Sequence, residues 1–246
     1  MNRLRSGPLA AWTCSWLAGV AASDEVIRAV TGDDATHTVE GLADGGTAPL
    51  SEALISWRRA GHQARLILPV PGDVRGVPGP APFRDAALDA GEAVYAGPLG
   101  LVPTVIERSP SSAPPAVIWH AFAVARAPDD YLAVTDAQYE LTSAIRECAS
   151  AISAAQVSAW IEGIDADLAS ARRAGERLNL PPGHPPAAVS LLAQAERLQA
   201  VLDLAARDPF GSAIDRPGMG VRTQALYLLA TAVRRARLAS YNAASD

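Results

Sequence analysis

Asp73 and Arg75 are the two charged residues of a glycine- and proline-rich segment, residues 69–82. A carboxylate and a guanidinium can hold a polar ligand, or they can bind each other and stabilise a turn. Glycine adopts backbone conformations closed to other residues, and proline fixes its φ angle, so this composition favours a loop of defined shape. We therefore interpret residues 69–82 as a candidate ligand-binding loop, with Asp73 and Arg75 as its polar contacts.

Two histidines, His120 and His184, could add acid–base chemistry to that loop. His120 lies in an apolar segment, 116–124, and His184 lies in the proline-rich connector 180–186. A general base needs a group that orients it, and no carboxylate close in sequence does so for His120. One hypothesis is that Asp73, His120 and His184 meet over one edge of a sheet. The alternative is that His120 is simply a satisfied residue of the sheet.

Asp33, Asp34 and His37 have a spacing that could place two metal ligands on one helical turn. Gly32 favours a helix end at this point, so a turn followed by a short strand over residues 37–42 fits the pattern better. We therefore expect no metal site here.

The absence of lysine excludes several reaction classes. All 21 basic residues are arginine, so the chain has no phosphate-loop lysine, Schiff-base lysine or pyridoxal-phosphate lysine. Arginine in place of lysine fits a GC-rich bacterial genome. The sequence contains no GxSxG, HExxH or GxGxxG motif and no paired-cysteine metal pattern, and we expect neither a cofactor nor a bound metal.

The elements around the candidate loop follow from hydrophobic periodicity. A strand is expected before the loop, at residues 64–70, and a helix is expected after Pro82. In open α/β sheets such a loop lies at the edge where ligands bind. Further strands are predicted at 93–95, 99–106 and 116–124. Pro103 predicts that the second of these is an edge strand or is interrupted by a bulge.

The N-terminal region supports two interpretations. An apolar stripe that includes Trp12 and Trp16 continues to Val30, which predicts one amphipathic helix ending near Gly32. The alternative is a signal peptide over residues 1–22, since Arg3 and Arg5 precede an apolar run. We favour the helix of the mature protein and a cytoplasmic location, because the two cysteines form no disulfide framework. An exported protein is the alternative.

Beyond residues 127–130 the period of the pattern changes to that of helices. Four apolar stripes of helical spacing predict a four-helix antiparallel bundle. Cys148 lies on one stripe and is expected to be buried and unreactive. Arg234, Arg235 and Arg237 are expected to be solvated near a helix end. The predicted fold is an α+β or α/β part with a small mixed sheet, residues 1–130, followed by the all-α bundle, residues 131–246.

The charge balance bears on the class of partner. The net charge is −5 and neither half has an excess of basic residues, so no nucleic-acid partner is expected. No apolar run is long enough to span a membrane. The favoured function is a non-enzymatic interaction or scaffold protein, whose apolar helix surface receives a protein partner or a second copy of the chain. The alternative is a small-molecule-binding protein or enzyme with its site at the 69–82 loop.

Overall fold

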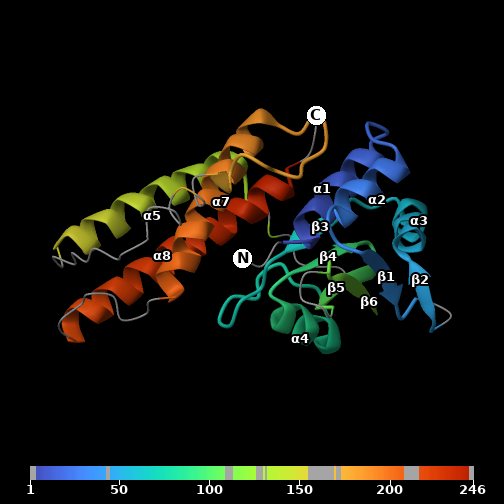
Figure 1. The fold of residues 1–246 in the computed structure, drawn as a ribbon, viewed down its shortest axis with the longest axis horizontal. Helices are drawn as coiled ribbons and strands as arrows, with labels where there is room; N and C mark the ends of the chain where they lie inside the picture. The colour runs from blue at the N-terminus through green and yellow to red at the C-terminus, as the bar shows by residue number, and fades with distance from the viewer. Residues whose placement is uncertain are drawn as a thin grey trace. The chain divides into compact units, whose positions relative to one another are not determined.

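The chain divides into two compact units in a computed structural model that describes residues 4–42, 45–108, 113–125, 130, 132–154, 169, 173–207 and 216–243 (Figure 1). The sheet unit comprises residues 2–131 and 179–184, and the helical unit comprises residues 132–178 and 185–243. Each unit has its own hydrophobic core, and we describe each by itself.

The sheet unit is built on one mixed sheet. Its 6 strands are ordered β2 (Thr47–Pro49), β1 (Thr36–Glu40), β6 (Ala116–Ala123), β5 (Leu99–Ile106), β4 (Ala93–Ala96) and β3 (Arg65–Ile67). β1 and β6 are parallel, and the other neighbouring strands are antiparallel. The prediction of a mixed sheet is confirmed, and the dominance of antiparallel pairs makes the fold α+β.

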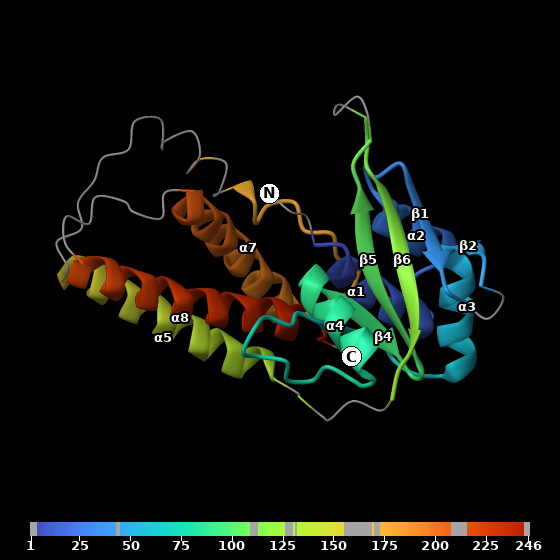
Figure 2. The same cartoon turned by 90° about the horizontal axis from the view of Figure 1, so that it is seen from below.

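Helices cover the two faces of this sheet unequally. α1 (Ser6–Leu17), α2 (Ser23–Thr31) and α3 (Leu50–Ala60) lie on one face, over buried residues such as Trp119 and Val39. α4 (Ala81–Ala90) lies on the other face, where Phe83 packs against Phe122 (Figure 2). Its ten residues reach only part of that face. The side chains of β1 and of the middle of β6 therefore remain half-exposed there.

The apolar stripe predicts a single N-terminal helix, and this prediction is wrong, because two helices form. α1 ends at Leu17, and Gly19 takes a left-handed conformation with φ +79° in the turn that follows. Glu25 then accepts a hydrogen bond from the backbone N–H of Ala22 at 2.8 Å and starts α2. Val20, which the stripe would bury, is 56% exposed.

Pro103 does not interrupt its strand with a bulge, and β5 is not an edge strand over its whole length. β5 runs unbroken over eight residues and pairs with β6 along its whole length. Its pairing with β4 covers only Leu99–Leu101. Pro103 therefore lies where this interior strand has one partner, so its missing N–H costs no bond on the open side.

A short segment from the C-terminal half of the sequence belongs to the sheet unit. Asn179 accepts a hydrogen bond from Trp12 Nε1 at 2.8 Å and donates one to the carbonyl of Ala29 at 2.6 Å. One side chain thereby joins α1 to α2. The connector predicted at residues 180–186 is thus partly an element of the sheet unit.

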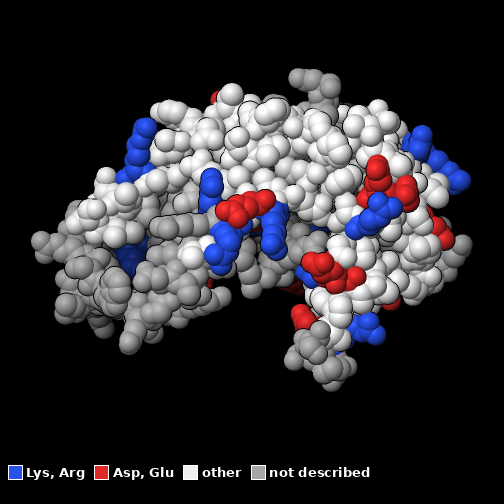
Figure 3. Space-filling model, turned by 45° about the horizontal axis from the view of Figure 1, so that its top comes forward, with Lys and Arg blue, Asp and Glu red and all other residues white. Residues whose placement is uncertain are grey.

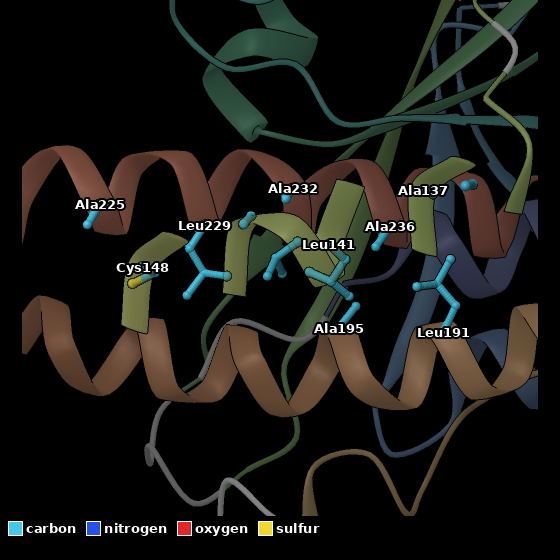
Figure 4. Packing of buried hydrophobic residues seen from close by; sticks show 12 residues of the cluster. Ala137, Leu141, Cys148, Leu191, Ala195, Ala225, Leu229, Ala232 and Ala236 are labelled. Atoms are coloured by element: carbon cyan, nitrogen blue, oxygen red, sulfur yellow. The ribbon is translucent and has the colours of Figure 1, made fainter. Parts of the chain in front are cut away.

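The helical unit contains α5 (Val134–Ala154), α7 (Pro186–Arg207) and α8 (Arg216–Tyr241). α8 packs against both other helices around a core that includes Leu141, Leu191 and Leu229 (Figure 4). Cys148 is buried in this core, as predicted, and burial raises the pKa of its thiol. Most of the predicted second helix, residues 157–178, lies outside the described residues. The described part of the chain therefore confirms helices in this half but not a four-helix bundle.

Two arginines of α8 were expected to be solvated, and this expectation is wrong. Arg235 makes a bidentate ion pair with Glu140 of α5, with distances of 2.7 and 3.0 Å. Arg237 binds Glu196 of α7 at 2.9 Å. Both guanidinium groups are mostly buried. They link the central helix of the unit to its two neighbours.

No helix in the described ranges is long and apolar enough to cross a membrane.

Candidate functional site

The two charged residues of the 69–82 loop bind each other. Arg75 Nε lies 2.8 Å from Asp73 Oδ1, and Arg75 Nη2 lies 2.8 Å from Asp73 Oδ2. Val70 and Asp73 exchange two backbone hydrogen bonds across a tight turn in which Gly72 has φ +87°. The loop is shaped, as its composition indicates. Its guanidinium and carboxylate bind each other within the turn, and a ligand-binding role for Asp73 and Arg75 stays a prediction.

The two candidate histidines lie in different environments. His184 is buried in the segment 179–184. His120 is half-exposed on the face of the sheet that α4 leaves partly open, and its Nδ1 lies 3.9 Å from Glu40 Oε2. The structure thus brings Asp73 together with Arg75, and His120 together with Glu40. The convergence of Asp73, His120 and His184 on one site stays a hypothesis.

Glu40 is the functional candidate that sequence reasoning missed. The parallel ladder of β1 and β6 places it directly opposite His120. The two side chains border a hollow of about 450 Å³, together with Gly41, Gly45, Gly46, Thr47, Ala121 and Phe122. Neither the strand pairing nor its register is encoded locally, because residues 40 and 120 stand far apart in sequence. A prediction that residues 36–40 pair in parallel with residues 116–120 would have found the site.

A second polar group is buried beneath α1. The guanidinium of Arg5 binds both carboxylate oxygens of Asp34 at 3.0 Å, and Asp34 Oδ2 lies 3.0 Å from Nε2 of His37. Trp119 Nε1 lies 3.1 Å from Nδ1 of His37. Because an indole nitrogen can only donate, Nδ1 must accept and Nε2 must carry the proton. Both ring nitrogens are therefore engaged, and a side chain that is 1% exposed has no path to a substrate.

The charge states in this group follow from its contacts. Burial acts to raise the pKa of Asp34, but hydrogen bonds from Arg5 and His37 outweigh it and lower that pKa. Glu92 accepts the backbone N–H groups of Arg5 and Ser6 at the start of α1, at 2.9 and 2.7 Å. Burial raises the pKa of Glu92 despite these bonds. The network fixes the start of α1 against β1 and β4.

The metal interpretation of Asp34 and His37 gains no support from this geometry. The two side chains do meet, but the guanidinium of Arg5 occupies the coordination space beside the carboxylate. Among the described residues, no group of three histidine, cysteine, aspartate or glutamate side chains could hold a metal ion.

An apolar hollow of about 600 Å³ lies between α1, α2 and α3. Its large apolar lining residues are Trp16, Ile27, Leu54 and Ile55, and the lining also includes serine, threonine and charged side chains. Arg58 lies over the ring of Trp16 at 4.9 Å. Ile55 is 44% exposed, although it sits on a helix whose other apolar residues are buried. The hollow was not predicted, because it depends on the break between α1 and α2.

Figure 3 shows how charge is distributed over one face of the molecule. Acidic and basic side chains lie beside one another there and form no large patch of a single sign among the described residues. A protein that binds a phosphate backbone concentrates its positive charge on one surface. The balance of charge in the sequence therefore extends to this face.

Comparison with known proteins places the chain in a family. The model for the N-terminal domain of Rv1486c-like proteins matches residues 6–132, and the model for their C-terminal domain matches residues 135–238. The chain belongs to the Rv1486c-like family. Uncharacterized protein Rv1486c of Mycobacterium tuberculosis strain H37Rv is 30% identical, over 96% of this chain and 95% of the relative.

Two further relatives of this Rv1486c-like protein come from other mycobacteria. Uncharacterized protein ML1804 of Mycobacterium leprae is 28% identical, over 96% of this chain and 95% of the relative. Uncharacterized protein MAV321 of Mycobacterium avium is 28% identical, over 80% of this chain and 78% of the relative. No solved structure matches the chain.

Proposed function

We propose that this protein is a non-enzymatic interaction protein that receives apolar side chains of a protein partner in the hollow between α1, α2 and α3. The observation that carries the proposal is an open hollow with Trp16, Ile27, Leu54 and Ile55 in its lining, of which Ile55 is 44% exposed. A water-exposed isoleucine beside a buried tryptophan and leucine is the arrangement of an anchor pocket.

The polar groups of the sheet unit support a binding role over a catalytic one. Asp34 and His37 form a buried dyad, but the dyad ends on an indole N–H and lacks a nucleophile. Asp73 is bound by Arg75 of the same turn. The alternative function, a ligand site or enzyme at the 69–82 loop, therefore rests on the shape of that loop alone.

The chemistry of the partner follows from the hollow. The hollow is open and lined by residues of α1, α2 and α3, and it suits an amphipathic helix that inserts two or three aliphatic or aromatic residues. A leucine-sized side chain that leaves water for such a site gains about 1.5–3 kcal/mol. A second copy of the chain could supply the same chemistry and would make the protein a homo-oligomer.

In this proposal α1 belongs to the mature protein, which is cytoplasmic. Leu9 and Ala10 belong to the core of the sheet unit, and Arg5 is bound to Asp34 within it. A chain without residues 1–22 would expose the faces of β3 and β4 that α1 covers. The interaction is therefore expected of the full-length chain.

Site-specific photo-crosslinking tests the proposal. A photoreactive amino acid replaces Ile55 in the hollow or, as the matched control, Ile106 on β5; these positions are 44% and 42% exposed. The protein is expressed in a mycobacterial host, because the relatives are mycobacterial. We expect a discrete adduct from position 55 that Ile27→Glu abolishes.

The possible results separate the occupants. An adduct with the mass of two chains identifies a second copy as the partner, and another discrete mass identifies a different protein. The same adducts from positions 55 and 106 would overturn the proposal, as would a position-55 adduct that survives Ile27→Glu. No adduct from position 55 in the folded protein would also overturn it.

A further inference from the structure

We propose that the hollow beside Glu40 and His120 binds a small organic cation through a protonated amino group. This site is separate from the apolar hollow of the proposed function, which lies on the other face of the sheet. The distance of 3.9 Å between Glu40 Oε2 and His120 Nδ1 exceeds the 2.7–3.2 Å range of a hydrogen bond. Each side chain therefore retains hydrogen-bonding capacity toward a third group.

An ammonium group matches the acceptors that line the hollow. It presents three N–H donors and no acceptor. The Glu40 carboxylate accepts with charge assistance, and a neutral imidazole offers one nitrogen as a further acceptor. Phe122 adds an aromatic ring to the same lining, against which the carbon stem of an amine can pack.

Charge selects a cation over an anion. Among the described residues that line the hollow, Glu40 is the one carboxylate, and no lysine or arginine faces it. A phosphate or carboxylate ligand would meet the negative charge of Glu40 in a described lining that includes no lysine or arginine. An alcohol could hydrogen-bond to both side chains but would lack the Coulomb attraction. The preferred class is therefore a primary amine in its protonated form.

Glycines keep the hollow accessible. Gly41 has φ +83°, and a side chain there would approach the carbonyl oxygen of Ala121 to 3.1 Å. At Gly45 and Gly46 an added Cβ would meet no atom within 4 Å. The chain thus turns away from β1 closely enough to shape the hollow and leaves open space at its border. Gly46 lines the hollow, so a bulky side chain at this position is expected to reduce its open space.

The test uses the full-length protein and three probes of similar size: n-propylammonium, n-propanol and propionate, at constant ionic strength. The readout is the NMR signal of the His120 ring, assigned with His120→Gln. We expect n-propylammonium to shift that signal in a saturable way in the millimolar range, as befits a ligand of four heavy atoms. Propanol and propionate should produce no saturable shift.

Two variants and a control locate the binding. Glu40→Gln should weaken n-propylammonium binding by roughly tenfold, because it removes the charged acceptor. Gly46→Leu should abolish binding and leave both polar side chains intact. Glu52→Gln, on an exposed position of α3, should bind like the unmodified protein.

Several results would overturn the inference. Equal saturable shifts by propanol would show a site for hydroxyl groups and not for cations. A shift that does not saturate would show only bulk ion effects. Unchanged binding in Glu40→Gln or Gly46→Leu would place the cation elsewhere. None of these results bears on the crosslinking at position 55, so the two proposals fail independently.

Discussion

Replacement of Asp34 by asparagine should destabilise the sheet unit strongly, although it changes only one group of one side chain. Asp34 and Arg5 are 4% and 7% exposed at their side chains, so the pair has almost no contact with solvent. Asparagine preserves the shape of the site but removes the carboxylate charge that binds the buried guanidinium of Arg5 through two hydrogen bonds. Breaking a buried ion pair from one side costs about 3–5 kcal/mol.

Urea denaturation measures this loss. With a slope of about 2 kcal/mol per M, the midpoint of the unfolding transition should fall by roughly 1.5–2.5 M. Asp24→Asn is the matched control, because Asp24 pairs with Arg28 at 3.3 Å and both side chains are more than 70% exposed. Such a surface pair contributes at most about 1 kcal/mol. The reasoning fails if the two variants lose the same stability.

A double variant separates the loss of the Arg5–Asp34 ion pair from other effects. Arg5→Met combined with Asp34→Asn removes the guanidinium, while the amide oxygen of the introduced asparagine can still accept the Nε2–H of His37. We expect the double variant to be more stable than Asp34→Asn alone. If it is instead less stable, the loss comes from packing or from His37, and not from the lost ion pair.

The pH dependence of the same variant has a definite sign. The pKa of Asp34 is lower in the folded protein than its ordinary value of about 3.9. Ionised Asp34 therefore contributes stability above that value, and the contribution disappears as the pH falls through the lowered pKa. The difference in free energy of unfolding between the unmodified protein and Asp34→Asn should have its full size at pH 7 and should become smaller below about pH 4.

Three further predictions address other parts of the sheet unit. Burial raises the pKa of Glu92, so its ionisation opposes folding as the pH rises. The free energy of unfolding of Glu92→Gln, measured in urea, should therefore increase relative to that of the unmodified protein from about pH 4 to pH 7. A difference between the two proteins that does not change with pH would contradict this. Asn179→Ala should cost about 1–3 kcal/mol, seen as a lower Tm, because it leaves Trp12 Nε1 without its acceptor. Gly100→Ala should cost about 1–3 kcal/mol, because its Cβ would lie 2.5 Å from the Phe83 ring and 2.8 Å from Val124 Cγ1. Combining it with Phe83→Leu should recover part of that loss, and no recovery would exclude the contact with Phe83 as the main cause.

Features with a local period could be predicted from the sequence. The stripe of α3, with Leu50, Leu54 and Trp57 buried, follows from spacing of three and four residues. The alternation of β6 separates Trp119, which points inward, from His120, which lies on the open face. Cys148 is buried for the same kind of reason, because it lies on an apolar stripe of its helix. In each case the residues that decide the structure are close neighbours in the chain.

Features that depend on distant partners could not be predicted. Arg5 has the position of a charge in a signal peptide, and only the folded chain shows that Asp34, 29 residues away, is its partner. The break between α1 and α2 depends on Glu25 and Gly19, whose capping roles compete with an uninterrupted apolar stripe. The site at Glu40 depends on the parallel pairing of β1 with β6. Tertiary packing decided the partner of Arg5 and the site at Glu40, whereas competing local signals decided the break between α1 and α2.

The division between buried and exposed polar groups links these results to function. Three ionisable side chains that could perform acid–base chemistry, Asp34, His37 and Glu92, are instead bound within the sheet unit, where they hold α1 and β1 in place. Their replacement should therefore change stability first and binding only through stability. Glu40 and Ile55 are exposed and make no comparable contact within the described part of the chain. Replacement of Glu40 or Ile55 should change binding and leave the stability nearly constant. Urea midpoints should therefore be measured for the same variants as the two binding assays. A variant of Glu40 or Ile55 that loses much stability would show that its residue belongs to the structural group.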